Sequence, residues 1–176
     1  MKFGNFFIQL SKKEPQNEWK TVNFYFCIAT QKLILEPNYL FAKGSFYWHV
    51  KEFEISQGEE IYEFCKNSMA QMNKNRQENC TERLDLVKYF NVKAYAGMVK
   101  KIESFQFCWT DWQGFYFAKG ECNRDGFTYF IDTKYEKFDA LPYEEFLTGY
   151  SKCVKRILKK LERREMKKLK NTGEPV

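Results

Sequence analysis

Apolar and polar residues alternate along the first third of the chain, with the two-residue period that is typical of a β-strand. The clearest run is 19–30, where every second residue from Val22 to Ile28 is apolar. The sequence Glu36-Pro37-Asn38 is expected to break this region, and Lys43-Gly44 to form a hairpin turn. The same pattern predicts further strands at 2–10, 39–42 and 45–55, and the segment 31–35 either continues the strand at 19–30 or pairs with it.

A spacing of three to four residues between apolar positions replaces the alternation after Ser56. Ser56 and Glu59 have the spacing of a capping box, so we expect a helix to begin there. A second helix is expected to be capped within 79–82, and a third, short helix to occupy 92–102. The last helix is predicted to run from Pro142, a residue favoured in the first helical turn, to about Lys170.

Strands return in the second half of the chain, at 104–110, 114–118 and 126–132. Together the elements predict an α+β fold: a mixed or antiparallel sheet of about six to seven strands, middle helices and a long amphipathic C-terminal helix. The length of 176 residues suits one compact domain with one core.

Short strings recur in the same order in the two halves of the chain. The string at 24–27, Phe-Tyr-Phe-Cys, is matched by Phe-Gln-Phe-Cys at 105–108, and Phe-Ala-Lys-Gly occurs at both 41–44 and 117–120. The offsets are 81 and 76 residues. One interpretation is two fused βββα-like repeats, 1–78 and 82–170. The other is convergent composition, in which aromatic strands are closed by Lys-Gly turns.

Charge is distributed unevenly along the chain. The net charge is +6, from 29 basic and 23 acidic residues. Between Lys152 and Lys170 there are ten basic and two acidic residues, a local net charge of +8, which leaves −2 for the rest of the chain. A basic terminal segment on a nearly balanced body indicates an interaction with an anionic partner.

On an α-helix the basic residues of this segment gather opposite the apolar residues. The stripe would be about 27 Å long, enough to meet several phosphates of a nucleic acid. We therefore expect a non-catalytic protein that binds nucleic acid or a nucleoprotein. A solvated face matched to the helix dipole and an acidic protein partner remain alternatives. The predicted contact residues are Lys152, Lys155, Arg156, Lys159, Lys160, Arg163, Lys167 and Lys170.

Carboxylates near strand ends offer a catalytic alternative. Asp132-Thr133-Lys134 has the acid-x-Lys form of many metal-dependent nucleases, and Asp111 follows an earlier predicted strand. In that scheme Asp111 and Asp132 would hold Mg²⁺, and Lys134 would orient the attacking water. The same form recurs at 18–20 and 165–167, as often as this composition gives by chance, so catalysis is the weaker hypothesis.

Aromatic side chains make up 19% of the chain. Within 24–26 and 46–50 they fall on both faces of a predicted strand. Either both faces of the sheet are therefore covered, or one of them is a surface that binds a partner or stacks on bases.

Other residue types argue against several functional classes. His49 is the only histidine, which excludes a multi-histidine metal site within one chain, and no glycine-rich phosphate loop is present. No cofactor or metal is therefore expected. The six cysteines lack Cys-x-x-Cys spacing, and we interpret them as reduced, mostly buried residues of a cytoplasmic protein. No apolar run is long enough for a membrane span.

Lys, Asn, Phe and Tyr are abundant, and all four have A/T-rich codons. This bias suggests a low-GC bacterium, its phage or a mobile element. A protein-binding inhibitor or immunity factor that acts by occluding its partner is a further hypothesis. It would require an aromatic or acidic patch on the nearly neutral body, with the basic helix idle.

Overall fold

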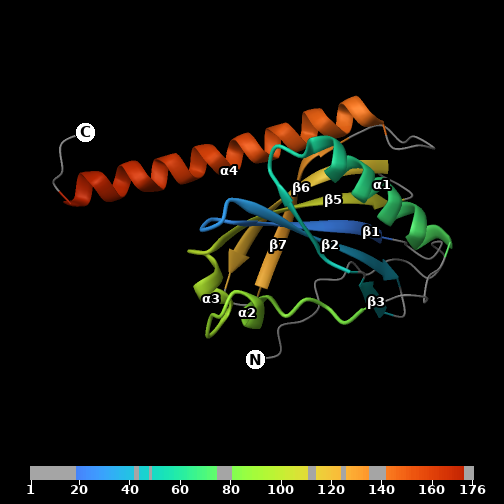
Figure 1. Ribbon diagram of the computed structural model, residues 1–176, viewed down its shortest axis with the longest axis horizontal. Coiled ribbons are helices and arrows are strands. Elements are labelled where there is room, and N and C mark those ends of the chain that lie inside the picture. Colours follow the sequence, from blue (N-terminus) through green and yellow to red (C-terminus); the bar gives the residue numbers. More distant parts are fainter. Residues whose placement is uncertain are drawn as a thin grey trace, which may run out of the picture.

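The computed structural model describes residues 19–41, 44–47, 49–74, 81–110, 114–123, 126–134 and 142–172. Strands and helices are segregated along the chain as expected for the predicted α+β class, which is confirmed (Figure 1). The elements are β1 (Trp19–Cys27), β2 (Lys32–Phe41), β3 (Gly44–Tyr47), β4 (Lys51–Glu54), α1 (Gly58–Lys74), α2 (Leu86–Tyr89), α3 (Tyr95–Met98), β5 (Ile102–Thr110), β6 (Gly114–Asn123), β7 (Gly126–Lys134) and α4 (Tyr143–Thr172).

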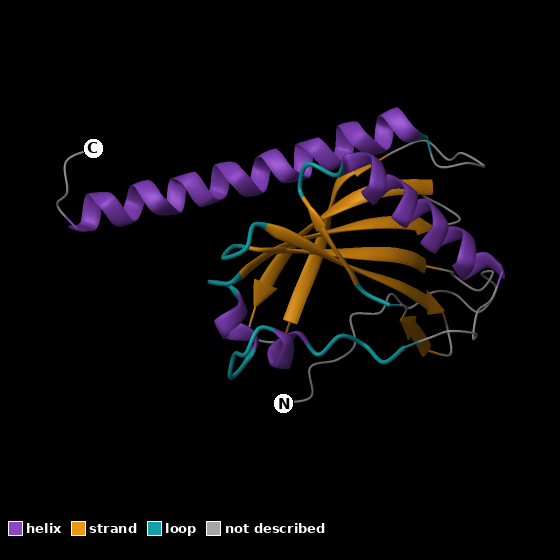
Figure 2. Ribbon diagram, viewed as in Figure 1, coloured by secondary structure: helices purple, strands orange, loops and turns teal. Residues whose placement is uncertain are grey.

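The described strands form one sheet in which every pair is antiparallel. Their order is β3-β2-β1-β5-β6-β7, and β4 also pairs with β2. The central pair, β1 and β5, runs from Trp19 opposite Thr110 to Cys27 opposite Ile102. Helices α1 and α4 cover one face of this sheet, and the short helices α2 and α3 lie at the other (Figure 2).

The main core lies between the sheet and the two long helices. Strand alternation places Phe24, Phe105, Phe107 and Phe117 on this face, and Phe107 and Phe117 pack against Phe146 of α4. All five side chains are buried. Burial of a phenylalanine side chain contributes roughly 1.5–3 kcal/mol relative to exposure, so this aromatic layer is the main reason that α4 docks on the sheet.

A smaller core covers part of the opposite face. Tyr25 and Ile34 of the sheet pack there with Leu86, Phe90 and Met98 from the segment that carries α2 and α3. Because Tyr25 is buried here while Phe24 is buried in the main core, both faces of β1 are covered at this point. The aromatic residues of 24–26 therefore form no exposed stacking surface.

The predicted break at Glu36-Pro37-Asn38 is wrong, because Pro37 lies within β2, opposite Val22 of β1. Proline has no N–H and disrupts a strand that is paired on both sides. On the outer side of β2, β4 pairs with 32–35 and β3 pairs with 38–41. The proline thus falls at the junction between two short outer strands, where neither of them needs its N–H.

The strand predicted at 45–55 is divided into β3 and β4, with the exposed His49 between them. The next helix, α1, begins at Gly58 rather than at Ser56. Gln57 shapes this start, since its Oε1 accepts a hydrogen bond from the backbone N–H of Glu54 at 2.8 Å. Its backbone carbonyl also accepts from the N–H of Ile61 at 3.0 Å.

The middle helices are shorter than predicted. The side chain of Asp85 caps α2 by accepting a hydrogen bond from the N–H of Lys88 at 3.1 Å, so the cap is not within 79–82. The helix predicted at 92–102 is reduced to α3, because Ile102 already belongs to β5, opposite Cys27. The strand predicted at 2–10 lies outside the described residues.

Of the two pairs of matching strings, the first occupies equivalent positions in the sheet and the second does not. Phe24 and Phe105, which begin the first pair of strings, face each other across the central strands. In the second pair, Phe41 pairs with Gly44 at the ends of β2 and β3, whereas Phe117 pairs with Phe107 along β5 and β6. The duplication and the single-domain assignment both stay predictions.

Candidate nucleic-acid interface

Helix α4 is longer than the core that it covers. Tyr150, Cys153 and Ile157 are buried, and Leu161 is the last of its apolar residues to pack against the main core. Beyond Arg164, every side chain described, at 165–169, is exposed. The end of α4 projects past the sheet (Figure 1). We call 165–172 the overhang, and its length is about 12 Å at 1.5 Å per residue.

Four basic residues follow one another at four-residue intervals along the solvent side of α4. They are Lys155, Lys159, Arg163 and Lys167, and we call them the basic stripe. All four side chains are exposed, and none forms an ion pair or hydrogen bond with a described residue. Each step rises about 6 Å, so the stripe is about 18 Å long. Its charges are available to an anionic partner.

The other predicted contact residues differ from the stripe. Lys152 is exposed and Arg156 is half-buried, and both take part in interactions within the protein. Arg156 and Lys160 lie beside Lys119 of β6, so this flank of α4 faces the sheet. Lys170 belongs to α4, but its side chain lies outside those that the structure describes.

Lys160 is held by the sheet. Its Nζ donates to Oε2 of Glu103 at 2.7 Å, and Nη2 of Arg164 lies 2.8 Å from Oε1 of the same carboxylate. The side chain of Glu103 is 8% exposed, against 44% for Lys160 and 34% for Arg164. Two charge-assisted contacts from successive turns of α4 to one strand fix the direction in which the helix leaves the body.

Sequence reasoning missed the role of Arg164. Its position on the helix continues the apolar face, which gave no reason to select it as a charged contact. Glu103 carries the signal that could have found it, since it takes an alternating position with Phe105 and Phe107 on the strand face that α4 covers. A carboxylate at such a position requires cationic partners from the covering helix.

The residues of the nuclease hypothesis are only partly placed. Asp111 lies outside the described residues. Asp132 and Lys134 belong to β7, but their side chains are not among those described. Over the described part of the chain, no three or more His, Cys, Asp or Glu side chains are grouped so that they could hold a metal ion. The nuclease hypothesis stays a prediction.

The five cysteines that the structure describes are free thiols, and Cys80 lies outside the described residues. Cys65, Cys108 and Cys153 are buried. Burial raises the pKa of the Cys65 and Cys108 thiols well above the usual range. Because the thiolate is the reactive form, these two residues are suited to packing rather than to nucleophilic chemistry.

A buried polar cluster joins the sheet to the α2–α3 segment. The carboxylate of Glu36, only 1% exposed, accepts hydrogen bonds from Nδ2 of Asn23 at 3.0 Å, the hydroxyl of Tyr25 at 2.9 Å and the N–H of Leu84 at 2.8 Å. Burial, with the nearby Tyr129 and Glu36, raises the pKa of Tyr25. The cluster therefore holds the segment before α2 against the sheet.

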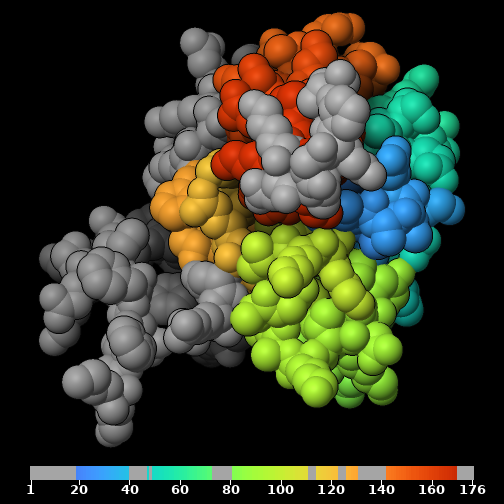
Figure 3. Space-filling model, turned by 90° about the vertical axis from the view of Figure 1, so that its left-hand side faces the viewer, coloured from blue at the N-terminus to red at the C-terminus, as the bar shows by residue number. Residues whose placement is uncertain are grey.

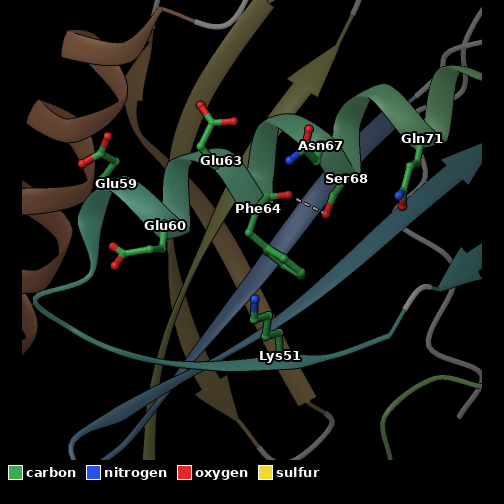
Figure 4. A pocket seen from close by; sticks show the side chains of 8 residues that line it. All are labelled: Lys51, Glu59, Glu60, Glu63, Phe64, Asn67, Ser68 and Gln71. Atoms are coloured by element: carbon green, nitrogen blue, oxygen red, sulfur yellow. Dashed lines mark hydrogen bonds between the residues drawn. The ribbon is translucent and has the colours of Figure 1, made fainter.

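A second surface feature lies on the body, between α1 and β4. It is a groove of about 570 Å³ that is lined by Lys51 of β4 and by polar side chains of α1 around Phe64 (Figure 4). Three of these side chains are the carboxylates Glu59, Glu60 and Glu63. Lys51 also lines the groove and Glu63 pairs with Lys66, so the groove is a weakly acidic patch. The inhibitor hypothesis requires such a patch together with an idle basic helix, and it stays a prediction.

Comparisons with known proteins give no family and no function for this chain. The chain matches none of the protein-family models, curated proteins or solved structures with which it was compared. Among the helices of the described residues, none has the length and apolar character that a membrane span needs.

Proposed function

We propose that this protein is a non-catalytic nucleic-acid-binding protein that holds its ligand with the basic stripe of α4. One observation supports the proposal. Four exposed cations with no partner among the described residues lie on one side of a helix that extends beyond the core on which it packs. Cations placed in this way displace the counterions condensed on a nucleic acid, and the release of those counterions drives binding.

A purely solvated, dipole-matched face explains less of the arrangement. The favourable interaction of a cation with the helix dipole falls off within the last turn. Lys155 and Lys159 lie more than three turns before Thr172, where α4 ends. The dipole therefore gives no reason for cations at those two positions, whereas a phosphate ligand accounts for the whole stripe.

The proposal is tested by reversing the charge of the stripe. In the stripe variant, Lys159→Glu, Arg163→Glu and Lys167→Glu are combined, and the affinity for a fluorescein-labelled DNA duplex is measured by anisotropy. If four phosphates are neutralised, the wild-type affinity should fall about a hundredfold between about 50 and 200 mM salt, and the stripe variant should lose binding.

A matched control carries the same charge change at exposed lysines outside α4, through Lys51→Glu, Lys88→Glu and Lys93→Glu. It should bind within a few-fold of the wild type at a given salt concentration. Equal losses in both variants would show that only net charge matters, and the proposed site would be wrong. Circular dichroism of both variants checks that the fold is intact.

The acidic groove between α1 and β4 favours a second candidate, a protein-binding inhibitor or immunity factor that acts by occlusion. The variant Glu59→Lys with Glu60→Lys separates the two candidates. If a protein partner is lost on this change but kept by the stripe variant, and no nucleic acid binds, the second candidate is favoured.

A further inference from the structure

We infer that the nucleic acid held by α4 is double-stranded DNA in the B form, with the overhang in the major groove and the basic stripe against the phosphates of the adjoining backbone. This inference rests on the proposed function and specifies its ligand. Three features of the described residues carry it: the convex shape of the site, the absence of a stacking surface beside it, and the dimensions of the overhang.

The site is convex. In the view from the side of the overhang, α4 lies above the segment that carries α2 and α3 (Figure 3). Nη1 of Arg164 donates to the backbone carbonyl of Val99 in that segment, at 3.4 Å. Beyond this point the described side chains of α4, at 165–169, are exposed, and the helix extends past the other described elements (Figure 1). Proteins that hold single strands use a cationic groove that follows the backbone, and an isolated helix has no groove.

No stacking surface accompanies the stripe. The aromatic side chains that are largely exposed among the described residues are Tyr89, Phe130 and Tyr143. Tyr89 is in α2, Phe130 is in β7, and Tyr143, at the opposite end of α4, packs against Tyr62 of α1. Single-strand binding depends on bases stacked on aromatic rings, so the described part of this site lacks its main contribution.

The dimensions of the overhang suit B-form DNA. A helix with its side chains is about 10–12 Å wide, and the major groove is about 12 Å wide and 8.5 Å deep. An overhang of about 12 Å can reach the floor of that groove before the body meets the backbone. The major groove of A-form RNA is too narrow and deep for side chains to read. The fit therefore selects a DNA duplex over an RNA duplex.

Three labelled probes of one sequence test the inference: a DNA duplex, a DNA single strand and an RNA duplex. We expect the full chain to bind the DNA duplex about tenfold or more tightly than either other probe at the same salt concentration. Equal or tighter binding of the single strand or the RNA duplex, with all binding lost in the stripe variant, would overturn the inference but leave the proposed function standing. If none of the probes binds at low salt, both are wrong.

Entry of the overhang into the groove is tested at Met166, which is 52% exposed. Met166→Pro breaks the helix beyond its apolar core contacts, because proline removes a helical hydrogen bond and clashes with the preceding turn. Met166→Ala is the matched control, since it keeps the helix and removes the same side chain. We expect the proline variant to bind the duplex about tenfold or more weakly than the alanine variant, because the two differ in the helix and not in the loss of the methionine side chain. Equal affinities in the two variants would overturn groove entry, and an unchanged Tm of both would show that the core is intact.

Discussion

Glu103 of β5 and Arg164 of α4 lie 2.8 Å apart, three residues after the point where α4 makes its last apolar contact with the core. The same carboxylate holds Lys160, one turn earlier on the helix. Two ion pairs therefore hold α4 to the sheet at the place where apolar packing ends. The direction of the overhang depends on these contacts.

Glu103→Gln should lower stability and strengthen binding. Removal of the charge weakens both ion pairs, and we expect a loss of about 1–2 kcal/mol, below the 3–5 kcal/mol of a fully buried pair because both cations are partly exposed. Lys160 and Arg164 are then available to phosphates, so the slope of log affinity against log salt should steepen by up to about 2. Chemical denaturation and anisotropy measure the two effects.

The control for this change is Glu54→Gln in β4, where an exposed carboxylate pairs with Lys32. Removal of the same charge there should change stability by less than about 0.5 kcal/mol, since exposed pairs contribute little. A salt slope that steepens equally in both variants would mean that general charge, and not the release of Lys160 and Arg164, is responsible.

Gly120→Ala should be destabilising. A Cβ atom at this position would lie 2.0 Å from Oγ and 2.8 Å from the backbone oxygen of Ser104 on the neighbouring strand. We expect a loss of about 1–3 kcal/mol in the free energy of unfolding, because a packed sheet cannot absorb such an overlap without moving. Addition of Ser104→Ala should restore only part of it, since the backbone contact persists. Full recovery of stability in the double variant would show that the whole steric clash is with the hydroxyl of Ser104 and none with its backbone.

Tyr25→Phe should destabilise through the buried carboxylate of Glu36. The substitution keeps the ring in the smaller core and removes one of three hydrogen bonds to that carboxylate. A buried acceptor that loses a partner costs about 1–3 kcal/mol. Thermal and urea unfolding measure the change. Tyr143→Phe, at an exposed position, should stay within about 0.5 kcal/mol, and an equal effect at both positions would exclude the buried cluster as the cause.

Ile157→Ala should lower stability much more than a substitution in the overhang, because Ile157 lies in the part of α4 that packs on the core. Ile157 is 7% exposed and contacts the main core, so its truncation should cost about 2–5 kcal/mol. Met166→Ala, in the overhang, should be neutral within about 0.5 kcal/mol. A comparable loss at Met166 in urea unfolding would show that the end of the helix is packed after all.

The elements that the sequence predicted well are those whose pattern reflects local geometry. Alternation at 19–30 led to β1, and the apolar spacing after Pro142 led to α4. The errors in the predicted strands and helices arose where residues distant in the sequence determine the local structure. Pro37 signals a break in isolation, but the junction of β3 and β4 on the outer side of β2 accommodates it. The short helices α2 and α3 are too brief for a periodic signal, and their packing against the sheet specifies them.

The candidate site was only partly visible in the sequence for a similar reason. A helical projection selects Lys155, Lys159, Arg163 and Lys167, which the structure leaves exposed. It cannot distinguish them from Lys160, because the difference depends on a carboxylate 57 residues away in the chain. The sequence likewise does not show at which residue of α4 the apolar core ends, because this depends on the extent of the assembled sheet.

The central pairing of β1 with β5 joins residues that are 75 to 91 positions apart in the chain. Until Thr110 has been made, β1 lacks its inner neighbour, and the β1–β2 hairpin offers an unpaired edge to any strand that it meets. Closure of this pair therefore has to overcome a large loop entropy, so we expect folding on a timescale of milliseconds or longer rather than microseconds. During synthesis, the first half of the protein is consequently its most aggregation-prone part.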